Sequence, residues 1–312
     1  MELSRKENIM KDLKSYLSLD STLFSESLPK NNPLNSLLER ALDNYTVSSP
    51  DKDAPKILWT PPRYKLDRTN AFNNLEIEQQ NNVMEKITEL NLSLSCYIET
   101  SGHNYGAKMI LLADTIEEKS IYALFAAEEA IHLKEFQNFM NFTPDPDIHW
   151  HPMLNPIAKA IEDGEKNTCL YIIQVLLEGF GMAHYSGLKD DCTYTPLKES
   201  YERILKDEAR HHGTGIILSK QSALSKIEKE QIFEYTREFI LSLQSASWVL
   251  KCIEEVGGNL SIEERKKYSE QTNQAQTMNF RLSKLREMLQ KVDEYDLVEK
   301  LDKDDVFKLK AS

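Results

Sequence analysis

The sequence predicts an all-α protein in which long amphipathic helices pack into a bundle, and three observations support this. Only 10 glycines and 11 prolines interrupt 312 residues, and β-branched runs are short, a balance that favours helices over sheet. Apolar residues recur every three or four positions, the spacing of one helix face. The segments with this spacing are long and are bounded by prolines, glycines or capping residues.

The N-terminal part of the chain is predicted to be an arm with short helices, covering residues 1–75. It holds short amphipathic pieces such as Leu34 to Leu42. Four prolines between residues 48 and 63 then exclude a long helix. We therefore expect residues 49–70 to lie extended over the body of the protein.

The first two bundle helices have recognisable ends. Asn74 can cap a helix that runs to about Leu112, and Thr115 with Glu118 has the spacing of a capping box for a second helix ending near Asn141. One face of the first helix is apolar. Its residues are Val83, Ile87, Leu90, Leu94 and Ile98.

Two more helices complete the predicted core, at about residues 156–185 and 196–218. Together the four helices make a core over residues 76–219. Residues 220–312 are expected to add further helices at about 224–256 and 261–310, with Gly257-Gly258 as a stop signal between them. The chain of residues 1–312 is interpreted as one domain.

Composition argues against several classes of partner. A formal charge of -12 disfavours nucleic acid or an anionic membrane surface. No apolar run approaches the roughly 20 residues of a membrane span, and the N-terminus lacks a signal core. The four cysteines are far apart and form no CxxC pair, which indicates free thiols in a reducing compartment. We expect a soluble, cytoplasmic protein.

Two Glu-x-x-His motifs point to a metal site. They are Glu129 with His132 and Glu208 with His211. On a helix, positions i and i+3 share one face, so a carboxylate and an imidazole at this spacing can bind one metal ion together. One such motif in a glutamate-rich chain is weak evidence, and two are stronger.

Two upstream glutamates strengthen the metal hypothesis. Glu99 precedes Glu129 by 30 residues, and Glu178 precedes Glu208 by the same interval. Both lie in apolar helical surroundings, where an unpaired carboxylate is costly. The interval fits a helix, a turn and an antiparallel return to the same level of a bundle. We therefore expect all four glutamates and both motif histidines to converge on two metal ions.

With these six residues, the segment 76–219 resembles the ferritin-like di-iron carboxylate superfamily. The string Asp-Glu-Ala-Arg-His at residues 207–211 is most similar to its oxygen-activating branch. That branch includes acyl-carrier-protein desaturases, multicomponent hydroxylases and p-aminobenzoate-type N-oxygenases. The resemblance implies a ferritin-like four-helix bundle with two iron ions, or a manganese–iron pair. It also implies an O₂-dependent oxygenase or oxidase that hydroxylates, desaturates or N-oxygenates a small organic or carrier-bound substrate.

The resemblance further assigns a role to each ligand. Glu129 and Glu208 would bridge two irons. Glu99 and His132 would complete one iron site, and Glu178 and His211 would complete the other. An unidentified electron donor is implied, and a homodimer is common among such proteins.

Three further residues would support the ligands by the same resemblance. Glu128 and Asp207 would each hydrogen-bond the ligating histidine of the opposite motif, and Arg210 would join them. Ile131 stands at the place in the first motif that matches Arg210. The supporting network is therefore expected to be asymmetric.

The chain also departs from its better-known relatives. Instead of a threonine one turn after Glu178 it has Gly179-Phe180-Gly181-Met182. The two glycines either leave a pocket beside the metal or permit close helix packing, and both interpretations stay open. Ile204 stands where the N-oxygenases have an additional histidine.

His103, one turn after Glu99, is a further candidate as an extra ligand or proton donor, with simple packing as its alternative. Three other functions are alternatives for the whole chain. A ferritin-like iron-oxidising or iron-binding protein without an organic substrate is disfavoured by the chain length. A haem-oxygenase-like scaffold has different ligand spacing, and a metal-free helical interaction protein would make both motifs coincidental.

Overall fold

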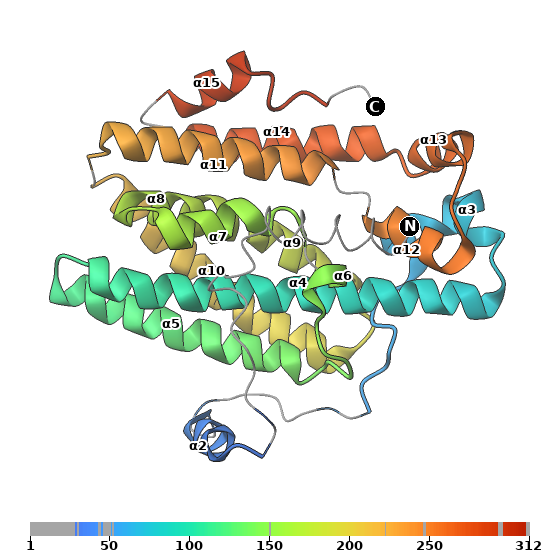
Figure 1. Ribbon diagram of the computed structural model, residues 1–312, viewed down its shortest axis with the longest axis horizontal. Helices are drawn as coiled ribbons and strands as arrows, with labels where there is room; N and C mark the ends of the chain where they lie inside the picture. The colour runs from blue at the N-terminus through green and yellow to red at the C-terminus, as the bar shows by residue number, and fades with distance from the viewer. Residues whose placement is uncertain are drawn as a thin grey trace, which may run out of the picture.

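The computed structural model shows an all-helical bundle, which confirms the prediction of an all-α protein (Figure 1). It describes residues 29, 31–42, 45, 51, 53–149, 151–221, 223–245, 248–292 and 296–309. Within this part of the chain the only β-type pairing is an isolated antiparallel bridge between Trp59 and Cys192. No helix among these residues combines the length and apolarity needed to cross a bilayer.

Two long antiparallel helices, α4 (Ile77–Leu112) and α5 (Ile116–Gln137), lie along one side of the bundle (Figure 1). The cap of α4 is Glu76, not Asn74 as predicted. Glu76 and Gln79 form a reciprocal capping box, whereas Asn74 follows the short helix α3 (Asn70–Asn73) as its C-cap.

Helix α5 begins as predicted but ends earlier than Asn141. The Thr115 hydroxyl accepts from the backbone N–H of Glu118, and the Glu118 carboxylate accepts from the N–H of Asp114. The helix ends at Gln137, and the N–H groups of Phe139 and Met140 then bond to carbonyls three residues back, as in tight turns.

The predicted third helix is wrong as a single element. It consists of α7 (Leu154–Asp163) and a separate helix made of α8 (Lys166–Leu170), a π-helical stretch η4 (Tyr171–Leu177) and α9 (Glu178–Asp191). The break falls at Gly164, whose backbone is extended and approaches the Ala160 carbonyl so closely that a Cβ would collide with it. The glycine therefore permits the chain to turn back within the predicted segment.

The fourth core helix, α10 (Thr195–Ser219), agrees with its prediction. Five more helices follow among the residues that the structure describes, and Gly258 at φ 94° lies directly after α12, where the glycine pair was predicted to stop a helix. They are α11 (Lys226–Ser245), α12 (Trp248–Gly257), α13 (Ile262–Gln271), α14 (Gln274–Val292) and α15 (Leu297–Lys303). Helices α11 and α14 form a layer over α7, α8 and α9, and α4, α5 and α10 lie on the other side of those helices (Figure 1).

The N-terminal arm is only partly extended. Leu58 and Trp59 are fully buried, and the Trp59 indole donates to the carbonyl of Leu188 at 2.8 Å. Residues 61–68 instead form two short 3₁₀ helices, η2 (Pro61–Tyr64) and η3 (Leu66–Arg68). Helix α2 (Pro33–Leu42) matches the amphipathic piece expected there. The rest of the expectation for residues 1–48 lies mostly outside the described residues.

All four cysteines are buried and unpaired, in agreement with the prediction of free thiols.

Candidate metal centre

Six buried side chains from four helical segments meet in the interior of the bundle. Helix α4 supplies Glu99, α5 supplies Glu129 and His132, the first residue of α9 is Glu178, and α10 supplies Glu208 and His211. All six are the residues that the motifs and the paired interval predicted to converge.

The six side chains form two overlapping groups. Within each group the ligand atoms lie within 4.8 Å of one another, and Glu129 and Glu208 belong to both. Glu99 and His132 complete the first group, called the Glu99 half below; Glu178 and His211 complete the second, the Glu178 half. This is the grouping that the resemblance implied.

In the Glu99 half the inward-facing polar atoms are hydrogen-bonded. His132 Nδ1 lies 3.1 Å from one oxygen of Glu99, and the Tyr185 hydroxyl donates to the other oxygen through a short hydrogen bond. On its outer side His132 Nε2 lies 3.2 Å from Asp207 Oδ2. The positions of Glu99 and His132 are therefore fixed by protein contacts.

In the Glu178 half two inward-facing atoms have no hydrogen-bond partner within the described part of the chain. They are Glu178 Oε2 and His211 Nδ1, both buried. His211 Nδ1 does lie 3.1 Å from Glu129 Oε1, but not in hydrogen-bond alignment. Buried polar atoms of this kind are costly unless a ligand satisfies them.

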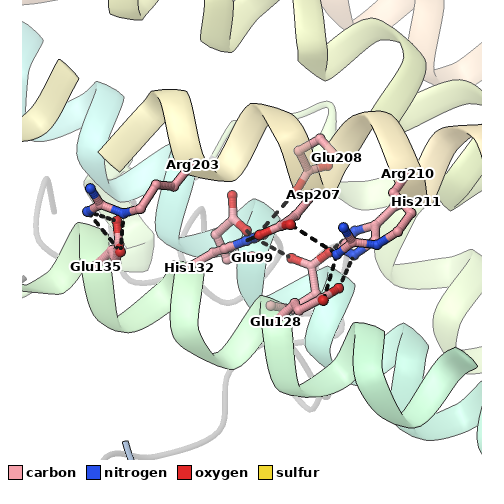
Figure 2. Close-up of polar contacts among 10 residues, drawn as sticks. Glu99, Glu128, His132, Glu135, Arg203, Asp207, Glu208, Arg210 and His211 are labelled. Atoms are coloured by element: carbon pink, nitrogen blue, oxygen red, sulfur yellow. Dashed lines mark hydrogen bonds and ion pairs between the residues drawn. The ribbon is translucent and has the colours of Figure 1, made fainter. Parts of the chain in front are cut away.

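The two halves share an outer carboxylate network. His211 Nε2 lies 2.8 Å from Glu128 Oε2, and His132 Nε2 lies 3.2 Å from Asp207 Oδ2 in the same kind of contact. Arg210 Nη2 donates to Glu128 at 2.6 Å and to Asp207 at 2.9 Å, which joins the two carboxylates (Figure 2). These contacts match the supporting roles that the resemblance assigned to Glu128, Asp207 and Arg210.

A separate ion pair between α5 and α10 lies beyond this network. Glu135 is buried one turn beyond His132, and Arg203 donates to both of its oxygens at 2.9 to 3.1 Å (Figure 2). Sequence reasoning missed this pair, because glutamate and arginine on separate helices carry no local signal that they meet.

Burial dominates the electrostatics of the carboxylates. It raises the pKa of Glu99 and of Glu178 well above the usual value and raises that of Glu208, and repulsion between the neighbouring carboxylates acts in the same direction. Burial opposes the ionisation of Glu129 too, but its contacts with His132 and His211 outweigh burial and lower its pKa. Without added cations, the four carboxyl groups therefore cannot all be ionised at the same time.

The two imidazoles respond in the opposite way. Burial acts against their protonation, but the surrounding carboxylates raise the pKa of His211 to about 11 and that of His132 well above its usual value. Protons on the imidazoles thus offset part of the carboxylate charge. A bound cation would take over this role and release those protons.

Two residues that position the ligands carried little sequence signal. Gly102 lies against Glu129, and a Cβ built on it would be 2.5 Å from the carboxylate carbon Cδ. Tyr185, which sequence reasoning assigned to core packing, binds Glu99. Gly102 follows Glu99 by three residues, which is about one helical turn, and Tyr185 follows Glu178 by seven, which is about two turns. Each therefore lies on the same helix face as a candidate ligand, and this spacing is the signal that could have indicated them.

The π-helical stretch η4 also contacts the centre. Gln174 accepts from the Tyr105 hydroxyl at 2.7 Å and donates to the carbonyl of His211 at 2.8 Å. Its own carbonyl lies 2.7 Å from His212 Nδ1, which must carry the proton because a carbonyl only accepts. These bonds tie the wide turn just before Glu178 to α10.

The structure does not bring His103 to the centre. Its side chain is exposed and belongs to neither group. Four residues advance a helix by about 40° more than one full turn, and at this position the extra rotation takes His103 to the solvent side of α4. The prediction that His103 could be an extra ligand is therefore wrong.

The two glycines after Glu178 have different surroundings. A Cβ on Gly179 would lie 2.7 Å from both His212 Cε1 and Met288 Sδ, so this glycine permits close packing. A Cβ on Gly181 would meet nothing within 4 Å, and Gly181 lines a cavity of about 20 Å³ beside the carboxylates. Gly179 therefore permits close helix packing, and Gly181 leaves a pocket beside the carboxylates.

No protein-family model, curated protein or solved structure matches this chain.

Proposed function

We propose that this protein is an O₂-dependent non-haem di-iron oxygenase or oxidase that acts on a small organic or carrier-bound substrate. The observation that supports this is the convergence of four buried carboxylates and two buried imidazoles in two overlapping groups. The arrangement resembles that of ferritin-like di-iron proteins, in which two glutamates bridge the metal ions.

The donor set suits iron or manganese. Carboxylate oxygens and imidazole nitrogens favour these ions over metals that prefer thiolate. Two divalent cations would balance the charge of the four carboxylates, which burial alone disfavours. They would also satisfy Glu178 Oε2 and His211 Nδ1, two buried atoms that have no hydrogen-bond partner among the described residues.

The outer carboxylates prepare both histidines in the same way. Asp207 and Glu128 each accept from a histidine Nε2, which leaves Nδ1 facing the inner carboxylates. A metal ligand must be the unprotonated nitrogen, so an outer acceptor at Nε2 fixes the useful tautomer. Arg210 holds the two acceptors in place.

Bound iron would supply the electrons that reduce O₂. The chain contributes a dry, small space for this chemistry, since Ile98, Ile173 and Leu177 line the cavity next to Glu178 and Glu208. Burial and the adjacent Glu99 hold the pKa of Tyr185 well above its usual value. Its hydroxyl therefore keeps its proton and continues to donate to Glu99.

The proposal is tested by loading the protein with ferrous iron anaerobically and then admitting oxygen. Wild type should bind two irons per chain and develop a visible absorption band. Glu129→Ala should lose both, because Glu129 belongs to both groups. Glu117→Ala, an exposed glutamate on the same helix, is the matched control and should behave as wild type. Unchanged iron content in Glu129→Ala would refute the metal site.

A further inference from the structure

Three cavities adjoin one another between the carboxylates and the outer part of the bundle. The small cavity beside Glu178 shares Ile98, Leu177 and Gly181 with a second cavity of about 90 Å³. The second shares wall residues with a third of about 240 Å³. These are His184, Trp248, Met278 and Arg281. The three cavities thus lie next to one another in a row from the centre to the third cavity, and this row is called the passage below.

The polarity of this passage changes along its length. The third cavity is lined by Arg63, Lys65 and Arg281 and by no carboxylate, although the chain carries a formal charge of -12. Apart from His151, His184 and Arg281, the second cavity has an apolar wall. The passage is therefore cationic at its outer end, apolar in the middle and closed by the carboxylate cluster.

One cation at the outer end is available to a ligand. Arg63 is paired with Asp191, and Lys65 donates to the Thr272 carbonyl and the Thr277 hydroxyl. Arg281 makes no hydrogen bond or ion pair with any residue that the structure describes, although it lies in the wall between the second and third cavities.

His184 adds a second polar group without a partner. Its Nε2 is buried and makes no hydrogen bond in the described part of the chain. Burial, with the nearby Arg63 and Arg281, lowers the pKa of His184 to about 3, so the imidazole is neutral. It can donate one hydrogen bond without adding a further charge beside Arg281.

We propose that the passage binds an organic monoanion with an apolar tail, whose carboxylate pairs with Arg281 and His184. The tail fills the second cavity, and its end passes Gly181 to reach the carboxylate cluster. The inference rests on the proposed function for the reaction at that end and names the substrate class. An acyl chain on a carrier protein is a thioester and would lack the free carboxylate.

A larger neighbouring cavity is less suited to such a ligand. It has a volume of about 320 Å³ and shares Leu94, His151 and Trp248 with the second cavity. It contains two lysines, but also three acidic residues. Charges of both signs offer an anion no clear net attraction.

The test measures binding of decanoate and of the uncharged alcohol 1-decanol to metal-free protein by calorimetry. Wild type should prefer decanoate. Because the Arg281 side chain is exposed, Arg281→Met should weaken decanoate binding by about two- to fivefold, the effect expected from removing an exposed ion pair, and should leave the affinity for the alcohol unchanged. Arg237→Met, on α11 and outside all three cavities, is the matched control.

A second variant probes the inner end of the passage. Gly181→Val places a side chain in open space, so the fold should persist while the junction with the small cavity narrows. Its preference should shift from decanoate towards hexanoate. An unchanged preference for chain length would contradict the proposed path of the tail.

Iron binding measured on the same samples separates the two proposals. Two irons in wild type with equal binding of decanoate and 1-decanol would overturn the substrate class and leave the proposed function standing. Selective anion binding without iron would support the passage and overturn the proposed function. Unchanged decanoate affinity in Arg281→Met would overturn the assignment of the anion site.

Discussion

The two halves of the candidate metal centre contain the same kinds of ligand but hold them differently. In the Glu99 half, both oxygens of Glu99 are occupied, one by His132 and one by Tyr185. In the Glu178 half, one oxygen of Glu178 and one nitrogen of His211 are buried and have no hydrogen-bond partner in the described part of the chain. The small cavity touches Glu178 and neither Glu99 nor His132.

If the centre binds two metal ions as proposed, this difference predicts that the two positions behave differently. Side chains that protein contacts already hold lose little freedom on binding an ion, so the Glu99 half should bind the first metal more tightly. The Glu178 half faces the cavity and has unsatisfied atoms. It should exchange its ligands more readily and lie nearest to O₂ and substrate.

The largest effect is expected from removing what both halves share. Gly102→Ala places a Cβ 2.5 Å from the Glu129 carboxylate carbon, so it should displace a ligand of both groups and weaken both metal sites at least tenfold. Alanine is favoured in a helix by about 0.5 to 1 kcal/mol, so the fold should survive. Metal content and thermal melting check this. Gly213→Ala on α10 has open space and should retain two irons; if Gly102→Ala does so too, Glu129 is not a shared ligand.

A smaller effect should distinguish the two halves. Tyr185→Phe removes the hydroxyl that donates to Glu99, and a hydrogen bond to a charged group contributes about 1.5 to 3 kcal/mol. We expect roughly tenfold weaker binding of one metal ion and little change for the other, measured by stepwise ferrous titration. Tyr201→Phe, whose ring lies 5.4 Å from that of Tyr185, should leave both steps unchanged. Equal weakening of both steps would remove the distinction between the halves.

The smallest effect concerns pH and tests the protons that balance the cluster. The pKa of His211 rises from 6.5 to about 11 in the folded, metal-free protein. A raised pKa contributes stability that is complete below 6.5 and is lost as pH rises towards 11. The melting temperature of metal-free wild type should therefore fall by several degrees between pH 6.5 and about 9. The fall should be smaller in His211→Gln, and an identical slope in both proteins would contradict the assignment.

The sequence was sufficient to predict the all-helical class and the six residues that converge. The reason is that helical periodicity and two equal intervals of 30 residues are local or nearly local properties. The caps were harder to predict. Glu76 rather than Asn74 begins α4 because Gln79 completes its capping box, and both positions carry polar residues.

The remaining features depend on contacts between segments. The break at Gly164 is set by the approach of its backbone to the Ala160 carbonyl. Gly102 leaves room for the carboxylate of Glu129, which comes from another helix. Arg281 can bind a ligand because no described residue forms a hydrogen bond or ion pair with it. Such properties arise only when distant parts of the chain pack together, so periodicity and spacing could not indicate them.

The wide turn at Tyr171–Leu177 has a consequence for how this helix tolerates changes in chain length. A π-helical turn accommodates one more residue than regular α winding, while the flanking segments α8 and α9 continue as one helix. A one-residue deletion within this turn could be absorbed by a return to α winding, with Glu178 kept in place. The same deletion in regular α helix would rotate everything beyond it by about 100°. The helix that presents Glu178 thus contains its own adjustment point for insertions and deletions.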